Sequence, residues 1–421
     1  MRTLQQCKNR ATNAGSWECA RETLYRTLPS LCFVVGVLAA RWKNHLAGDN
    51  PEACQLREAP ATLTGSSSSP CLISMHARRA VRAVGVTSII TTASFMAERR
   101  PAAGRYEELS TLDPANPFAT FAHVRAEEGP VGEPWLLECR DRGRLVCGCI
   151  GFVGRGRMNC RLTITSLPEV SEDFWAGMKS LIAKERITIL ELNTFSSRTL
   201  NIPSLGTELG RKRRYEYVVP LDGTPDDILR RMHKHHRQSV RKGMDTGLVV
   251  RTGNECRLED HVKVIGASMQ RRVGRGEQIE SPPTLEGLQA CLNSGLCRLF
   301  QACRGDEVVS SMSVAIAPRG RYLHTSGTSP EGMKSGASHY LLYEIMRVSI
   351  AEGATLLNLG GVSDPDSGLA QYKRHFGSDC WESEAAQFYV GSGLRRVAWN
   401  SAVLLKDLLK LRRTTATGTE A

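Results

Sequence analysis

Residues 321–361 read RYLHTSGTSPEGMKSGASHYLLYEIMRVSIAEGATLLNLGG and decide the expected fold of the second half of the chain. The alternating segment Arg321–Thr328 predicts a β-strand. Apolar residues then recur at helical spacing over Ala337–Glu352, and Gly353 is placed to end that helix. Another apolar segment, Thr355–Leu359, predicts the next strand. A strand, a crossover helix and a parallel strand place the helix N-terminus and a strand end at one opening of the sheet.

The segments on either side predict a mixed sheet. Strands are expected at Cys297–Cys303 and Val308–Ala317, and the turns Arg304-Gly305-Asp306 and Pro318-Arg319-Gly320 predict two antiparallel hairpins. Three antiparallel strands followed by one strand–helix–strand unit do not alternate as a doubly wound fold would. The sequence therefore predicts an α/β protein with a mixed sheet.

The remaining elements follow from capping residues and periodicity. Thr224-Pro225-Asp226-Asp227 combines a capping hydroxyl, a proline at the first helical position and acids, which predicts a helix running to about Asp245. Further helices are expected at Asn116–Arg125, Ser171–Lys184, Leu258–Arg272, Thr284–Asn293 and Leu369–His375. Further strands are expected at Trp135–Cys139, Leu145–Val153, Arg161–Ser166, Ile187–Leu192, Tyr215–Leu221, Leu248–Thr252 and Ala385–Tyr389.

Composition restricts the class of protein. The 421 residues carry a net charge of +12 with 41% hydrophobic and 23% charged residues, which is typical of a globular chain and excludes a disordered one. The longest apolar stretch, Leu31–Ala40, is too short to span a bilayer. No export signal is evident, and the 14 cysteines are scattered without a disulfide framework or zinc-site spacing. We therefore expect a cytoplasmic protein without a bound metal.

Four regions are expected along the chain. Residues 1–104 are basic, rich in serine and without periodicity, which predicts a disordered or non-native N-terminal extension. Residues 105–222 and 223–393 are expected to form two domains. Residues 394–421 place apolar residues at helical spacing among arginines and lysines. This pattern predicts a cationic amphipathic helix, which either packs on the second domain or lies on an anionic membrane.

A loop before the helix that begins at Ala337 is the predicted binding site for a phosphate-bearing donor. The free N–H groups at a helix N-terminus suit a phosphate, and small residues there allow close approach. A plain turn is the alternative interpretation. The residues assigned to this site are Lys334, Ser335, Gly336, Ala337 and Ser338.

Further candidates follow the loop along the chain. Asn358, Gly360 and Gly361 end the strand after the helix, where paired glycines let a ligand approach the backbone or form a simple turn. Tyr372 and Lys373 lie on the next helix. A tyrosine can protonate a thiolate and a lysine can neutralise an oxyanion, although the two can also pack and be solvated, respectively.

The last candidates for substrate binding are Arg237, Arg241 and Tyr322. Arg237 and Arg241 are four positions apart on the expected helix, where they either clamp a phosphate or form a solvated basic face. Tyr322, on the strand before the donor loop, is assigned to substrate contact. The neighbouring histidines at 233, 235 and 236 have poor metal-ligand spacing.

The second half of the sequence resembles the GNAT acyltransferases, and more specifically their FemAB-like branch. The segments that carry the resemblance are YLHTSGT, GASHYLLYEIMRVSIAEGATLLNLGGV and GLAQYKRHFG. The resemblance covers residues 210–390 well and implies two tandem GNAT-like domains. It implies that a helix N-terminus holds the pyrophosphate of acyl-CoA. Lys373 falls on the lysine of the branch's F-K-x-x-F-G motif, with Tyr372 in place of the first phenylalanine. The phosphate-loop pattern Q/R-x-x-G-x-G/A is met only at its central glycine.

The resemblance implies an N-acyltransferase that moves an acyl group from acetyl-CoA or another acyl-CoA to an amine. The amine would belong to a small molecule or a polysaccharide precursor. One alternative is an aminoacyl-tRNA-dependent enzyme acting on a cell-wall precursor, in which the basic helix Arg230–Lys242 would contact tRNA phosphates. Another is a GNAT-fold binding protein without catalysis. Peripheral contact with the inner face of an anionic membrane, through residues 394–421, is a further expectation.

Overall fold

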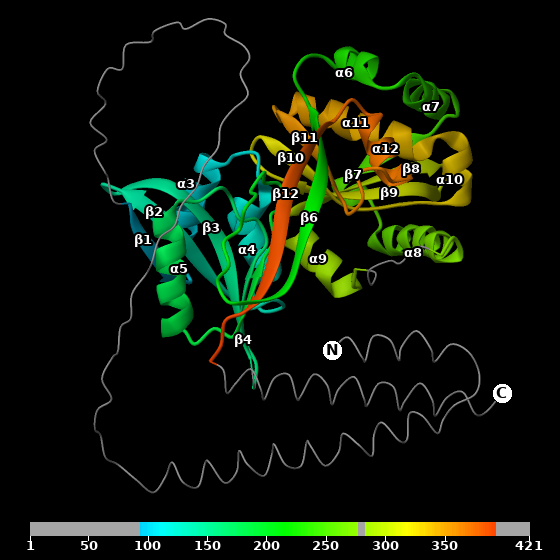
Figure 1. Ribbon diagram of the computed structural model, residues 1–421. Coiled ribbons are helices and arrows are strands. Elements are labelled where there is room, and N and C mark those ends of the chain that lie inside the picture. The colour runs from blue at the N-terminus through cyan, green and yellow to red at the C-terminus, as the bar shows by residue number, and fades with distance from the viewer. Residues whose placement is uncertain (1–92, 158, 277–282, 393–421) are drawn as a thin grey trace, which may run out of the picture. The chain divides into compact units, whose positions relative to one another are not determined.

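A computed structural model describes residues 93–157, 159–276 and 283–392 (Figure 1). The expectations for residues 1–92 and for the amphipathic helix at 394–421 lie outside these ranges. Strand β1 (Ser94–Arg99) pairs along its whole length with β2 (Glu133–Asp141). The fold therefore begins before residue 105, and the extension expected to reach residue 104 was placed too far along the chain.

The described residues form one mixed sheet of twelve strands in the order β1-β2-β3-β4-β5-β12-β6-β11-β10-β9-β8-β7. The other strands are β3 (Arg144–Arg155), β4 (Cys160–Ile164), β5 (Ile189–Leu192), β6 (Thr207–Pro220), β7 (Val249–Thr252), β8 (Cys297–Arg304), β9 (Glu307–Ile316), β10 (Gly320–Thr328), β11 (Leu356–Val362) and β12 (Asp379–Tyr389). The α-helices are α3 (Ala103–Leu112), α4 (Phe121–Glu127), α5 (Glu172–Lys184), α6 (Pro225–Arg231), α7 (Lys234–Asp245), α8 (Leu258–Gly274), α9 (Leu285–Asn293), α10 (Pro330–Ser335), α11 (Ala337–Ala351) and α12 (Gly368–Arg374).

Two halves of this sheet repeat one topology. In the first half, β1 to β4 form an antiparallel meander, and α5 crosses over to β5, which is parallel to β4. In the second half, β7 to β10 form the same meander, and α11 crosses over to β11, which is parallel to β10. The long strands β6 and β12 pair antiparallel between the halves. This repeat is the tandem mixed-sheet arrangement that the sequence predicts.

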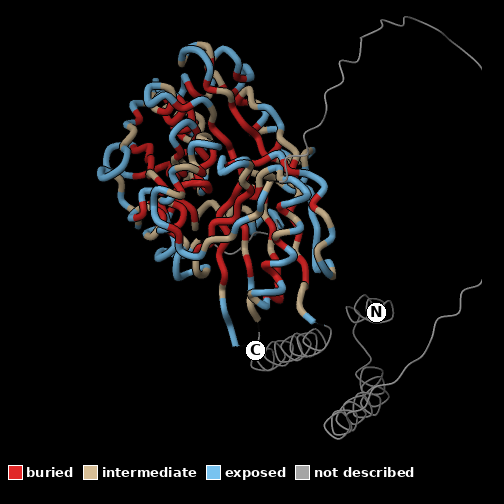
Figure 2. Tube along the Cα trace, turned by 90° about the vertical axis from the view of Figure 1, so that its left-hand side faces the viewer, coloured by how far each residue is buried: buried red, intermediate tan, exposed pale blue. Residues whose placement is uncertain are grey.

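Helices cover both faces of the second half (Figure 1). One face carries α6, α7, α11 and α12, whose apolar side chains meet the strands in one core that includes Val240, Leu341 and Phe376. The opposite face carries α8 and α9, and α8 packs on β9 and β10. In the first half, Phe174 and Met178 of α5 are fully buried against the sheet. Figure 2 shows the resulting band of buried residues along the strands.

The helix expected from Pro225 to Asp245 is broken at Met232, whose backbone is extended. The ring of His233 caps α7 by accepting from the amide of His235. The guanidinium of Arg237 donates to the carbonyls of Arg230 and Met232, at 3.0 and 2.6 Å. These contacts satisfy the last carbonyls of α6, which would otherwise lack partners.

Strands β6 and β12 are much longer than expected because ion pairs hold their polar halves. Arg211 contacts Glu384 at 2.8 Å, and Arg213 pairs with Glu382 across the strands. Charged pairs of this kind leave no alternation of apolar residues to detect. No helix in the described ranges is long and apolar enough to cross a bilayer.

Candidate active site

Strands β10 and β11 separate after three paired positions, and this separation locates the candidate site. The last pair is Tyr322 with Asn358. Beyond it, β10 continues to Thr328, paired only with β9 among the described strands. Strand β11 instead bulges against β6 and passes through Gly360, whose φ of +75° is a left-handed conformation. The free edge of β10 therefore presents backbone N–H and C=O groups that no strand takes up.

Glu216 of β6 is the centre of a polar cluster at this separation. Its side chain is fully buried and accepts hydrogen bonds from Tyr322 Oη at 3.0 Å and Asn358 Nδ2 at 2.7 Å. The backbone amide of Ser196, from the first half, donates to it at 2.9 Å, and Arg214 Nη2 lies 3.8 Å away. Burial raises the pKa of Glu216 above its ordinary value, although these partners oppose the shift.

Lys373 of α12 points to the same place. Its buried ammonium group donates to the carbonyls of Gly360 and Gly361, at 2.9 and 3.0 Å. A β-carbon on Gly360 would lie 3.7 Å from Lys373 Nζ and 3.8 Å from Tyr322 Oη. Burial lowers the pKa of Lys373 to about 8. The structure thus brings together Tyr322, Asn358, Gly360, Gly361 and Lys373, which the sequence placed only as separate candidates.

Tyr372 lies on another side of α12. Its ring packs against His236, His339 and Phe376, with ring centroids 5.2 Å apart in each case. Ser338, near the start of α11, is the neighbour that lowers the pKa of Tyr372, against the effect of burial. Burial raises the pKa of Tyr372 to about 12, so the phenol is protonated at neutral pH and can donate a proton.

The predicted donor loop is largely helical. Ser329 caps α10 through the amide of Gly332, and Pro330 occupies its first turn. Ser335 donates back to the carbonyls of Glu331 and Gly332, so its hydroxyl bonds within its own helix. Lys334 is exposed and lies 4.0 Å from Glu331. Ala337 and Ser338 begin α11, where a helix leaves its first N–H groups without an intrahelical partner.

Gly336 joins α10 to α11 with a φ of +75°. A β-carbon there would lie 2.5 Å from the backbone oxygen of Ser239 in α7. The interpretation that Gly336 leaves room for a donor phosphate is therefore corrected, because the missing side chain makes room for α7. Gly336 is itself buried.

The two arginines on α7, Arg237 and Arg241, have different environments. Arg237 is held by the carbonyls at the end of α6, so its guanidinium stabilises the break between the two helices. Arg241 is exposed. The phosphate clamp predicted from their spacing would therefore require Arg237 to leave two backbone contacts.

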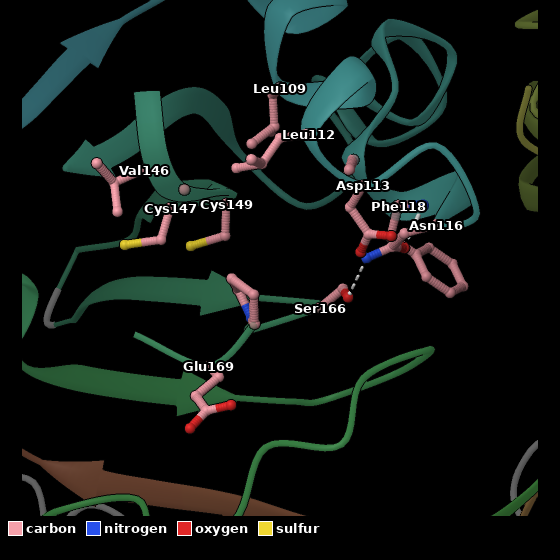
Figure 3. Close-up of a pocket in the computed structure, with 13 residues that line it drawn as sticks. Leu109, Leu112, Asp113, Asn116, Phe118, Val146, Cys147, Cys149, Ser166 and Glu169 are labelled. Atoms are coloured by element: carbon pink, nitrogen blue, oxygen red, sulfur yellow. Dashed lines mark hydrogen bonds between the residues drawn. The ribbon is translucent and has the colours of Figure 1, made fainter. Parts of the chain in front are cut away.

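A pocket of about 280 Å³ lies in the first half (Figure 3). Asn116 donates to Ser166 at 2.8 Å in its wall, and Asp113 and Glu169 supply carboxylates. Phe118 lines the pocket and also packs edge-to-face on Tyr322 at 5.1 Å, so one ring separates the pocket from the cluster. Sequence patterns miss this pocket because its walls come from distant segments.

Glu216 was also missed from the sequence. The available signal is a carboxylate inside the otherwise apolar strand Tyr215–Leu221, since a charge at such a position is rarely buried without partners. Alternation alone did not distinguish it from a residue on the solvent face.

Comparison with known proteins agrees with this geometry. Residues 212–374 match the family model described as an acetyltransferase (GNAT) domain, and no curated protein matches the sequence. The crystal structure of FemX is 12% identical with a TM-score of 0.53, covering 71% of this chain and 99% of that chain. A tandem GNAT protein from the clavulanic acid biosynthesis pathway is 12% identical, covers 71% and 100%, and has a TM-score of 0.44. At such identity the likeness to FemX concerns the fold. Residues 212–374 are therefore similar to a GNAT acetyltransferase domain, and they lie within a fold similar to that of FemX.

Proposed function

We propose that the protein is an N-acyltransferase whose thioester donor, an acyl-CoA, binds along the free edge of β10. The separation of β10 from β11 beside Lys373 and Glu216 carries this proposal. The unpaired backbone groups of β10 would hold the donor by hydrogen bonds, as an added strand is held. The first N–H groups of α11, at Ala337 and Ser338, would face the donor's phosphates.

Lys373 would stabilise the charge that develops during transfer. An ammonium group has three donors, and the carbonyls of Gly360 and Gly361 take two of them. The third can donate to the oxyanion formed when the acceptor amine attacks the thioester carbonyl. Glu216 would act as a positioning residue, because it holds Tyr322 and Asn358 on the two separating strands.

The reaction forms a C–N bond and breaks the C–S bond of the thioester. The proton that the attacking amine loses would reach the leaving thiolate through solvent, because Tyr372 lies beside Ser338, at the proposed phosphate site, and not beside Lys373. The acceptor would approach from the pocket next to Phe118, where the carboxylates of Asp113 and Glu169 suit an amine. An uncharged amine is required for the attack itself.

The test uses the full chain with labelled acetyl-CoA and a panel of amines, including amino sugars. Transfer that depends on Lys373 supports the proposal, and Lys179→Met is the matched control because Lys179 of α5 is exposed and belongs to no proposed site. Stabilisation by acetyl-CoA in thermal unfolding tests donor binding separately. The acyl-CoA proposal is refuted if no acyl-CoA gives transfer and none stabilises the protein.

Aminoacyl-tRNA is the second donor considered, because α7 is strongly basic. Lys234, Arg241 and Lys242 of this helix are exposed. Such a surface suits nucleic-acid phosphates, and binding would weaken steeply with salt. Stabilisation by aminoacyl-tRNA but not by acetyl-CoA would select this donor, and stabilisation by neither would favour a non-catalytic GNAT-fold binding protein.

A further inference from the structure

Two cysteines and a histidine from three different elements meet beside the candidate site. Cys291 is in α9, Cys297 is the first residue of β8, and His324 is in β10. Their ligand atoms all lie within 4.8 Å of one another. Both cysteines are buried and His324 is exposed. The group therefore reaches from the core of the second half to its surface.

We propose that Cys291, Cys297 and His324 bind Zn²⁺. Zinc takes thiolate and imidazole ligands at about 2.3 and 2.0 Å in tetrahedral geometry, so its ligand atoms lie about 3.3–3.8 Å apart. Closing the present separations requires side-chain rotation rather than refolding. Two thiolates balance the charge of the ion, and two thiol protons are released on binding. Three protein ligands leave a fourth position for water or another ligand.

The surroundings favour a metal over a simple packing role. The two thiols belong to one buried cluster, and their sulfur atoms lie within 4.8 Å of each other. Core packing would account for two buried thiols. It does not account for an exposed imidazole with a ring nitrogen within 4.8 Å of both thiol sulfurs.

The position of His324 links this site to the opening between β10 and β11. The pairing of β10 with β9 shifts register between Leu323 and Thr325, so His324 is the additional residue of a bulge. It lies two positions after Tyr322, at the start of the free edge of β10. A metal bound here would tie that bulge to the turn between α9 and β8. The zinc proposal rests on ligand geometry and stands independently of the proposed acyl transfer.

Metal binding is tested on the full chain, kept reduced and stripped of metal with a chelator. The protein is then dialysed with Zn²⁺ and its metal content is measured by mass spectrometry. The His324→Ala variant should lose one equivalent of zinc relative to wild type, and so should Cys297→Ala. With Co²⁺ in place of Zn²⁺, wild type should show near-ultraviolet thiolate-to-cobalt absorption, which His324→Ala should weaken or shift.

Two variants serve as controls. His235→Ala removes an exposed histidine of α7, and Cys380→Ser removes an exposed cysteine of β12. Both should keep the wild-type zinc content and cobalt spectrum. Since His324 is exposed, its variant should fold, which circular dichroism checks independently. Equal zinc content in wild type and His324→Ala would overturn the proposal, and so would equal zinc content in wild type and Cys297→Ala.

Discussion

The hydroxyl of Tyr322 donates a hydrogen bond of 3.0 Å to the carboxylate of Glu216, although 106 positions separate the two residues. This bond joins β10 to β6 across β11, the strand that lies between them in the sheet. Asn358 of β11 donates to the same carboxylate. One buried acid therefore connects three strands at the point where two of them separate.

Removing the Tyr322 hydroxyl should destabilise the protein. Tyr322→Phe leaves one oxygen of a buried carboxylate short of a donor, which costs about 1–3 kcal/mol of unfolding free energy. Tyr106→Phe is the control, because Tyr106 is equally buried and its hydroxyl has no partner among the described residues. Urea unfolding of both variants measures the difference. Equal stabilities would mean that the Glu216 contact contributes nothing.

Replacing Lys373 should affect the chemical step more than donor binding. Lys373→Met retains an unbranched side chain of similar length but removes the donor for the oxyanion, so kcat should fall by about 10²–10³-fold. The dissociation constant of acetyl-CoA, measured by calorimetry, should change little. Lys179→Met, at an exposed position of α5, should leave both quantities unchanged. A Lys373→Met variant with full turnover would remove Lys373 from the mechanism.

Lys373 should also give a pH-dependent contribution to stability. Its pKa falls from an ordinary value of 10.5 to about 8 in the folded protein, chiefly because burial disfavours the charge. Between pH 8 and 10.5 the unfolded chain binds the proton and the folded protein does not, so stability rises with pH across this window. Below pH 8 Lys373 is charged in both the folded and the unfolded protein, so the full free-energy cost of burying its charge lowers stability there.

The expected measurement compares wild type with Lys373→Met. The difference in unfolding free energy should shift in favour of wild type by up to about 3 kcal/mol between pH 8 and 10.5. Comparing the two proteins cancels the titration of the tyrosines and cysteines. A difference that is flat over this range would show that Lys373 retains an ordinary pKa.

Gly336 and Gly353 allow a matched test of helix packing. Both have a left-handed backbone, with φ of +75° and +78°, but a β-carbon at Gly353 would meet no atom within 4 Å. Alanine at Gly353 should therefore cost about 1 kcal/mol for its backbone conformation alone. Gly336→Ala should cost about 2–4 kcal/mol, because the new methyl group also meets the backbone of α7. Equal costs in thermal unfolding would contradict the close contact with Ser239.

Much of the local structure could be predicted from the sequence. The hairpins of β8 to β10, the crossover α11 and the strand β11 all followed from periodicity, turn residues and capping signals. These signals act over a few residues, because a strand or helix buries one face of its own sequence. The resemblance to GNAT enzymes rested on the same stretch, and the matching family model covers it.

Other features depend on contacts between distant segments, so no local pattern reports them. The polar halves of β6 and β12 form a strand pair only because their charges lie opposite each other. The glycine at 336 was interpreted as space for a ligand, whereas Ser239 of another helix occupies that space. Cys291, Cys297 and His324 lack a known zinc spacing in sequence, and their proximity appears only when α9, β8 and β10 come together.

The sequence by itself determined the order of strands and helices in the second half, apart from α10 and the break between α6 and α7. It also determined the types of side chain available for the proposed acyl transfer. Tertiary structure decided which of those side chains meet. Lys373 and Tyr372 are neighbours in sequence, yet one bonds to Gly360 and the other packs by Ser338. The reason is geometric: successive residues on a helix point about 100° apart, so each contacts a different element. Glu216 becomes the centre of the site only because β6 lies beside β11 in the folded sheet.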